Sequence, residues 1–227
     1  MAEKMKATVP LALAVGVLAF LYIELTANFT FHWVTEGNLG NGLSLPANFH
    51  LVVPAGFITW GLFFALGADT KAYRSVSINS VLGSAAALIL FIFVAVIKGL
   101  PDFWSIALGV GLLAFILITL SGGLDWINVP VVFGTFAATV MWWIATGLDG
   151  WAKNGGGIGK SLTALAKPAT AGTGAFGGVL STPYWWVAID VAATLLLGVL
   201  FGVMSVKLAG VVARNPIASR ESGAATT

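Results

Sequence analysis

Long apolar runs dominate the chain and are separated by short polar or glycine-rich stretches. A transmembrane helix needs roughly 20 mainly apolar residues, and six runs approach or exceed that length. Strands of a membrane barrel would show about ten residues of alternating hydrophobicity, whereas residues 85–96 show no alternation. The pattern therefore predicts an all-α, polytopic integral membrane protein. Its six predicted transmembrane helices span residues 9–28, 49–67, 75–97, 103–120, 126–147 and 184–206.

The segments between and around these helices predict one transmembrane domain over residues 1–227. Residues 149–183 form a long glycine-rich connection that is expected to be a flexible outer loop. The small, polar residues from about 215 onward are expected to form a disordered tail. A retained first helix is favoured over a cleaved signal peptide, because Glu24 interrupts the apolar run and no clean cleavage site follows.

Composition supports the membrane assignment. Of the 227 residues, 58% are hydrophobic and only 9% are charged, and the mean hydropathy is +0.95. A soluble domain carries roughly a quarter charged residues, so a soluble enzyme is excluded. The chain has no Cys and only two His, which argues against thiolate or multi-His metal sites. We therefore expect no enzyme activity, no catalytic residue, no cofactor and no metal.

The distribution of Lys and Arg predicts the orientation in the membrane. With six helices, both termini lie on the side that carries the larger number of basic residues, which is the cytoplasmic side. That side holds Lys4, Lys6, Lys71, Arg74, Lys207, Arg214 and Arg220, and the other holds Lys98, Lys153, Lys160 and Lys167. Because these residues are scattered at helix ends, they do not indicate binding to nucleic acid.

Helices two and five open with the same pattern, V-P-x-x-F-x-T, at residues 53–59 and 129–135. One of these helices starts outside and the other inside, so the pattern predicts two inverted three-helix halves, as in many transporters. A chance match of four positions is the alternative. The prolines are either ordinary first-turn prolines or helix starts whose free carbonyls line a pathway. In the second case Phe57 and Phe133 would form opposed constrictions.

Glu24 and Asp190 are acidic residues within predicted helices, where a charge is costly. Counted from the helix ends, both lie roughly 6–9 Å below the outer boundary, so we expect them to line one outer vestibule. The alternative is that each is wetted at the interface or packs against a neighbour. His32 and His50, in or beside the first outer loop, are solvent-facing or act as pH sensors.

Small and polar residues recur every four positions along several helices. Helix six carries such a stripe from Asp190 to Gly202, and helix three carries another from Ser75 to Ala87. These stripes indicate either a polar pathway or, because Gly-x-x-x-Gly favours close approach, a helix–helix seam. The predicted pathway residues are Glu24, Asp190, Thr194, Phe57, Thr59, Phe133, Thr135, Thr139 and Asn128, and the predicted packing residues are Gly198 and Gly202.

The run Val129-Pro-Val-Val-Phe-Gly-Thr-Phe136 and the run Gly198-Val-Leu-Phe-Gly202 resemble bacterial inner-membrane proteins of domain-of-unknown-function family 1097. The resemblance covers residues 9–211, apart from an insertion at 149–183. It implies a six-helix protein of the bacterial cytoplasmic membrane and carries over no functional residue. The size and helix count are also similar to those of bacterial urea/amide channels and acetate/succinate permeases.

Two functions remain open from the sequence. The polar stripes, the repeated pattern and the two carboxylates favour a channel or permease for a small neutral or weakly acidic solute. The close-packing glycines and the weak polarity at the centre of the helices favour a non-catalytic structural or accessory subunit of a larger membrane complex. Expected partners are the lipid bilayer and further copies or other subunits, with a small solute in the first case.

Overall fold

The computed structural model of the protein describes residues 2–30, 49–101, 103–146, 148–151 and 183–214. This part of the chain contains six helices and no strand, which confirms the all-α prediction. The predictions about the tail, about His32 and about most of the loop 149–183 lie outside the described residues. The helices are α1 (Ala2–Asn28), α2 (Val53–Ala65), α3 (Thr70–Val96), α4 (Trp104–Ser121), α5 (Val129–Ala145) and α7 (Tyr184–Arg214).

Four helices, α1, α3, α4 and α7, are long and apolar enough to cross a membrane. The apolar helices α2 and α5 have only 13 and 17 residues. At a rise of 1.5 Å per residue these cover about 20 and 25 Å, which is less than the roughly 30 Å of hydrocarbon in a bilayer. The apolar helices thus indicate a membrane-embedded protein. Because α2 and α5 are shorter than the hydrocarbon layer, the segments that precede them are also important for the fold.

The helix ends differ from the predicted ones where local chemistry rather than hydropathy determines them. Helix α3 begins at Thr70 instead of residue 75, because Asp69 caps it by accepting a hydrogen bond from the Ala72 amide at 2.7 Å. Helices α2 and α5 begin at 53 and 129 instead of 49 and 126, each with a proline in the first turn. Helix α1 extends beyond its apolar run into residues of high helix propensity, and helix α7 continues to Arg214.

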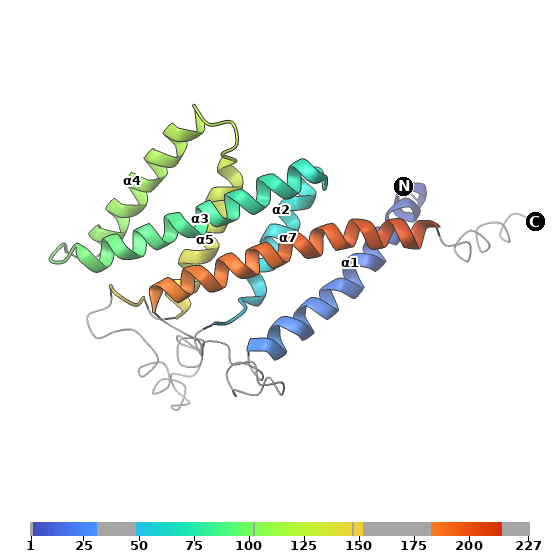
Figure 1. Ribbon diagram of the computed structural model, residues 1–227, viewed down its shortest axis with the longest axis horizontal. Coiled ribbons are helices and arrows are strands. Elements are labelled where there is room, and N and C mark those ends of the chain that lie inside the picture. Colours follow the sequence, from blue (N-terminus) through green and yellow to red (C-terminus); the bar gives the residue numbers. More distant parts are fainter. Residues whose placement is uncertain (1, 31–48, 102, 147, 152–182, 215–227) are drawn as a thin grey trace, which may run out of the picture.

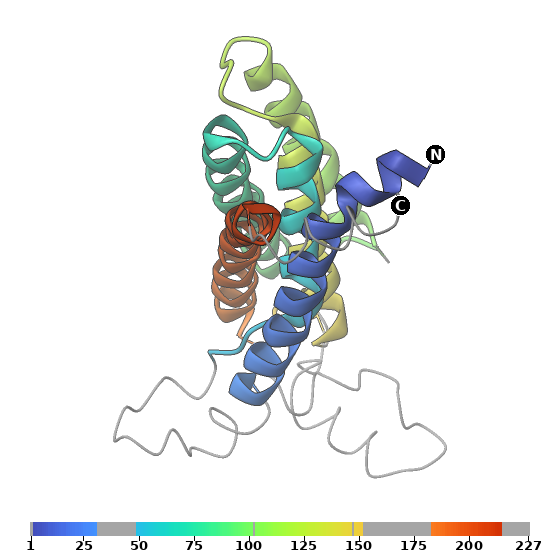
Figure 2. The ribbon, with the colours of Figure 1, turned by 90° about the vertical axis from the view of Figure 1, so that its right-hand side faces the viewer.

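Two three-helix units make up the bundle. The long helices α3 and α7 lie side by side through its middle, with α4 on one side and α1 on the other (Figure 1). Helices α1 and α2 pack on α7 and form the first unit, while α4 and α5 pack on α3 and form the second unit. Helices α2 and α5 also contact each other and lie together on one side of the central pair (Figure 2). The first unit therefore combines helices that are distant in sequence, whereas the second consists of three consecutive helices.

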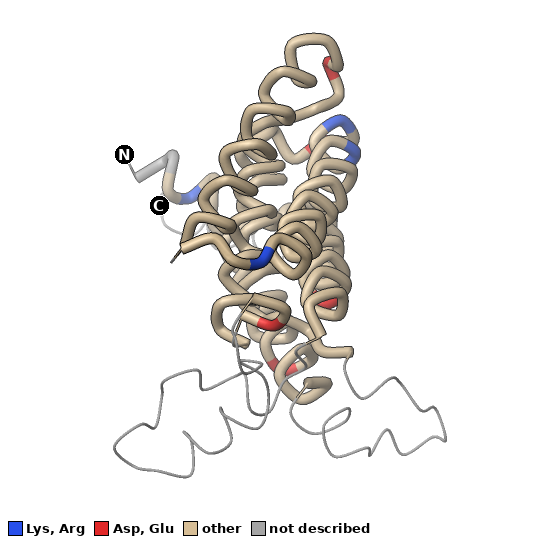
Figure 3. The backbone as a smooth tube through the Cα atoms, turned by 90° about the vertical axis from the view of Figure 1, so that its left-hand side faces the viewer, with Lys and Arg blue, Asp and Glu red and all other residues tan. Residues whose placement is uncertain are grey.

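Aromatic packing fills both units, and apolar side chains also cover their outside. The rings of Phe91 and Trp143 stack at 4.7 Å in the second unit, and Tyr22 meets Phe201 at 5.1 Å in the first. On the outer face of α4, Phe115 is 71% exposed. Charged residues are few along the chain (Figure 3). Apolar side chains exposed over whole helix faces are typical of a surface that contacts lipid.

Candidate functional site

The segment before α2 (residues 49–52, the pre-α2 segment) is buried but not helical. Its backbone groups are satisfied by side chains instead. The Thr30 hydroxyl, just after α1, accepts a hydrogen bond from the Leu51 amide at 2.9 Å and lies 3.0 Å from the Leu51 carbonyl oxygen, to which it donates. The Val52 amide donates to the Thr194 hydroxyl of α7 at 2.9 Å. Non-helical backbone at membrane depth is tolerated only when it is buried and paired in this way.

The segment before α5 (residues 124–128, the pre-α5 segment) is held by one side chain of α3. Asn79 is fully buried and donates from Nδ2 to the Trp126 carbonyl at 2.9 Å. Its Oδ1 accepts from the Asn128 amide at 2.8 Å. The Asn128 side chain in turn caps α5 by accepting from the Val131 amide at 3.2 Å. A single asparagine of α3 therefore fixes the start of α5.

Glycine allows α2 to approach α7 closely. A Cβ atom at Gly198 would lie 2.6 Å from the Gly56 carbonyl carbon, which is closer than real Cβ atoms come. At this contact the Thr59 hydroxyl donates to the Leu195 carbonyl of α7 at 2.6 Å. The two helices thus form a seam that combines backbone contact with a hydrogen bond from threonine.

The contact between α3 and α5 has the same construction. A Cβ atom at Gly83 would lie 2.7 Å from the Val132 carbonyl oxygen. The Thr135 hydroxyl lies 3.2 Å from the Asn79 carbonyl of α3 and 2.9 Å from the Val131 carbonyl of its own helix, within hydrogen-bond reach of both. Here too, a glycine and a threonine bring two backbones together.

Residues of the two seams correspond at constant spacings. The spacing is 76 positions between α2 and α5 (52 with 128, 56 with 132, 59 with 135) and 115 between α3 and α7 (79 with 194, 83 with 198). Val52 and Asn128 also share a backbone conformation, with φ −91° and ψ 88° against φ −99° and ψ 97°. Phe57 and Phe133, again 76 positions apart, are 39% and 38% exposed. The contacts between α2 and α7 therefore have counterparts between α5 and α3.

The two phenylalanines face different helices. The Phe57 ring lies 5.2 Å from the Tyr22 ring of α1. Phe133 instead lines a hollow of about 130 Å³ together with Leu113 and Leu117 of α4. The two rings thus face α1 and α4, and their role as opposed constrictions stays a prediction.

Asp190 is fully buried on α7, beside the pre-α2 segment. That segment contacts α7 one turn before Asp190, where the Phe49 and Trp186 rings are 6.4 Å apart, and one turn after it, at Thr194. The buried His50 lies in the segment between these two contacts. The Thr194 hydroxyl donates to the Asp190 carbonyl at 2.7 Å and so links this position to the seam. His50 thus lies in the non-helical segment before α2, and Asp190 lies on the helix that packs against this segment.

Glu24 lies elsewhere. Its side chain is exposed and accepts a hydrogen bond from Asn28 Nδ2 at 3.0 Å. The buried residues Tyr22 and Thr26 define the inner face of α1. Glu24 is two positions from Tyr22, which places it about 200° around the helix, on the opposite face. The structure does not bring Glu24 and Asp190 together in one vestibule.

The predicted pathway threonines lie in the seams. All are fully buried, and each hydroxyl is within hydrogen-bond distance of a backbone carbonyl. Thr139 also lies 3.2 Å from the Ser84 hydroxyl of α3. In this conformation they join helices and have no contact with water. These threonines are Thr59, Thr135, Thr139 and Thr194.

The structure adds residues that the sequence did not single out as site residues. Asn79 and Thr30 hold the two non-helical segments, and Gly56 and Gly83 complete the seams. One signal in the sequence was available for Asn79 and Gly83. The stripe from Ser75 to Ala87 has the same four-residue spacing as the stripe from Asp190 to Gly202.

Replacing Asn79 with alanine is expected to lower the free energy of unfolding by about 1–3 kcal/mol. The change leaves the partly buried Asn128 amide and the Trp126 carbonyl without the partners that Asn79 supplies. Thermal unfolding of the detergent-solubilised protein measures the effect. The matched control is Asn28→Ala, since Asn28 hydrogen-bonds only within α1 among the described residues. Equal stability of the two variants would contradict the role given to Asn79.

No group of three or more His, Cys, Asp or Glu in the described part of the chain is arranged to hold a metal ion. Comparison with known proteins gives no match to a family model, to a curated protein or to a solved structure.

Proposed function

We propose that the protein is a membrane permease for a small neutral or weakly acidic solute, built from two inverted three-helix halves. The observation that carries this proposal is the correspondence between the two seams, at spacings of 76 and 115 positions. It relates α2 to α5 and α3 to α7, and the packing of α1 on α7 corresponds to that of α4 on α3. An inverted repeat with non-helical segments at corresponding helix starts is an architecture of secondary transporters.

The arrangement of the two units suggests how such a permease would work. The first unit holds α7 from the second half, and the second unit holds α3 from the first half. The units meet where α3 lies beside α7 and where α2 crosses α5. Rocking of one unit against the other around the pseudo-two-fold axis would expose a site to each side of the membrane in turn.

The two ends of the bundle differ, as alternating access requires. At one end Asp190 and His50 are buried. Their counterparts at the other end, by the same spacings, are Ser75 and Trp126, and these line an open hollow of about 340 Å³. In an inverted-repeat transporter, the end that is closed in one conformation is open in the other, and the reverse holds for the opposite end. We infer that this conformation is closed at the Asp190 end and open at the Ser75 end.

Asp190 is a buried acidic residue at the closed end, and its carboxyl group determines which solutes could bind there. A carboxylate accepts hydrogen bonds from an amide or alcohol and repels anions. When protonated, it also donates a hydrogen bond to a carbonyl or to a weak acid. These properties suit a small polar solute that is neutral in its transported form.

Purified protein in liposomes is expected to give saturable uptake of at least one solute from a panel of small amides, polyols and weak acids. Asp190→Asn is expected to lower that uptake about tenfold or more, since a hydrogen bond to a charged group contributes roughly 1.5–3 kcal/mol. The variant keeps the shape of the side chain, so unfolding temperature should change little. Glu24→Gln is the matched control, because it removes an exposed carboxylate. Equal loss of uptake in both variants would remove Asp190 from the proposal.

An accessory subunit is the second candidate function. The observation that favours it is the complete burial of the seam threonines, which leaves them no contact with water in this conformation. If no solute in the panel enters above the rate of empty liposomes, this function replaces the first. Partners that co-purify from native membranes in mild detergent would then identify the complex.

The membrane arrangement is part of the same proposal. We propose that all six helices span the membrane, with the pre-α2 and pre-α5 segments completing the spans of the short helices. The start of α1 and the end of α7 lie at the same end of the bundle (Figure 1), and we assign that end to the cytoplasm of a bacterium. The resemblance to family 1097 and the exposed apolar faces of α1 and α4, available to lipid or to further copies, support this assignment.

A further inference from the structure

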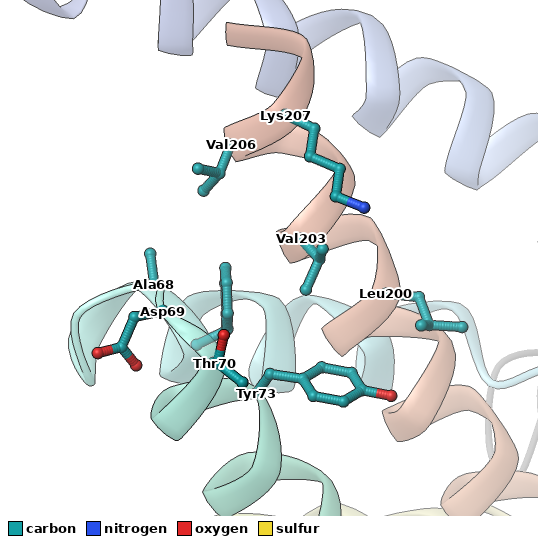
Figure 4. Close-up of a pocket in the computed structure, with 9 residues that line it drawn as sticks. Ala68, Asp69, Thr70, Tyr73, Leu200, Val203, Val206 and Lys207 are labelled. Atoms are coloured by element: carbon teal, nitrogen blue, oxygen red, sulfur yellow. The ribbon is translucent and has the colours of Figure 1, made fainter. Parts of the chain in front are cut away.

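A cavity of about 490 Å³ lies between the start of α3 and the last turns of α7. One wall consists of the apolar residues Leu200, Val203 and Val206 of α7, and Phe63 closes the groove from α2. Figure 4 shows the Tyr73 ring of α3 extending toward this wall. The size falls within the roughly 300–1,000 Å³ of ligand-binding pockets, and the lining is mainly apolar, as in such pockets.

The rim of this groove is polar and carries a cation. Lys207 of α7 is exposed on one side of the groove and Thr70 lies on the α3 side, while the Tyr73 ring reaches across and places its hydroxyl near Leu200 (Figure 4). Asp69 is also on the rim, but its Oδ1 accepts the capping hydrogen bond from the Ala72 amide. The groove thus joins an apolar wall to a positively charged mouth.

The start of α3 adds further positive charge beside the groove. Lys71 and Arg74 are exposed and line the neighbouring hollow of about 340 Å³. The acidic residue in that hollow is Asp125. Three exposed cations therefore surround the first turn of α3, and the two carboxylates near them do not balance their charge.

We propose that this groove binds an anionic phospholipid. The glycerophosphate headgroup lies at Lys207 and the Thr70 hydroxyl, and part of one acyl chain lies along Leu200 and Val203. Basic pockets between membrane helices recognise anionic headgroups in this way. The occupant is a lipid and not a free phosphate ester, because most of the lining is apolar and the surrounding helices are those of a membrane-embedded protein. The proposal does not depend on transport activity.

The test measures lipid retained by the intact protein. Protein purified in neutral detergent is incubated with phosphatidylglycerol or phosphatidylcholine, and bound lipid is counted by native mass spectrometry. Wild-type protein is expected to retain phosphatidylglycerol in preference to phosphatidylcholine. Lys207→Gln should weaken phosphatidylglycerol binding about fivefold, the effect of one basic residue near an anionic headgroup, whereas Lys207→Arg should keep it. Lys6→Gln is the matched control, since Lys6 is an exposed cation on α1 outside the groove.

Two further measurements distinguish binding to the apolar wall from simple charge attraction. Val203→Trp fills the groove without changing the charge and is expected to displace the lipid. Glycerol phosphate, which has the headgroup chemistry but no acyl chain, is expected not to compete at millimolar concentration. Equal losses in Lys207→Gln and Lys6→Gln, full retention in Val203→Trp, or displacement by glycerol phosphate would each overturn the proposal.

Discussion

Replacing Gly198 with leucine is expected to lower the unfolding midpoint by about 6–12 °C, because overpacking against a neighbour that cannot move costs roughly 3 kcal/mol, the upper end of the usual range. The neighbour here is the backbone of α2 at Gly56, which cannot rotate away as a side chain can. The new side chain would have to push α2 off α7 and break the hydrogen bond from Thr59 to Leu195. Circular dichroism during heating, with size-exclusion chromatography for assembly, measures the effect.

Two other glycines sharpen this prediction. Gly83→Leu is expected to have an effect of similar size, since Gly83 meets the backbone of α5 in the corresponding seam. Gly111→Leu on α4 should leave the midpoint unchanged or raise it, because nothing lies within 4 Å of a Cβ there and leucine is the better helix former. If Gly198→Leu behaves like Gly111→Leu, the close seam described for α2 and α7 is wrong.

Joining the two units by a disulfide is expected to lower solute uptake about tenfold or more, because transport by rocking needs the units to move. The pair Leu62→Cys and Gly134→Cys links α2 to α5 where the units meet. A Cβ at Gly134 would lie 3.8 Å from Leu62 Cδ1, so the two positions are in contact. The chain contains no cysteine of its own, so no other disulfide forms. Uptake into liposomes is compared before oxidation, after oxidation and after reduction, and reduction should restore it.

A second disulfide separates motion between the units from a general effect of cross-linking. Phe93→Cys and Gly109→Cys join α3 to α4 inside the second unit, where a Cβ at Gly109 would lie 3.0 Å from Phe93 Cδ1. This bridge should leave uptake within about twofold of the reduced protein, because it restrains helices that move together. Full uptake with the Leu62–Gly134 bridge closed would rule out rocking of the units as the transport step.

The apolar runs were sufficient to predict that the protein is helical and where its six helices lie, since that signal depends on composition over many residues. Helix ends depend on single contacts that hydropathy does not register. Asp69 starts α3 earlier than its apolar run, and the segment before α2 is mainly apolar yet not helical, because Thr30 and Thr194 bind its backbone. Those partners are distant in sequence, so no local pattern contains them.

The polar stripes were visible in the sequence because a spacing of four places residues on one helix face. Which helix each stripe packs against depends on the tertiary structure, so a pathway and a seam could not be distinguished for Thr59 or Thr135 from the pattern alone. The depth of a residue along its helix was easier to predict than the direction in which its side chain points. Glu24 and Asp190 were matched by counting from helix ends, but Glu24 turns away from the bundle while Asp190 is enclosed by it.

Helix α7 packs with α1 and α2, and α3 packs with α4 and α5. This arrangement has a consequence for synthesis. Helix α2 leaves the ribosome early, yet its main partner, α7, begins only at residue 184. At translation rates of roughly 5–20 residues per second, α2 waits on the order of 6–25 s for that partner. Throughout this interval a 13-residue helix, too short to span the bilayer by itself, has its glycine face uncovered. Assembly of the first unit can therefore be completed only after α7 has been synthesised.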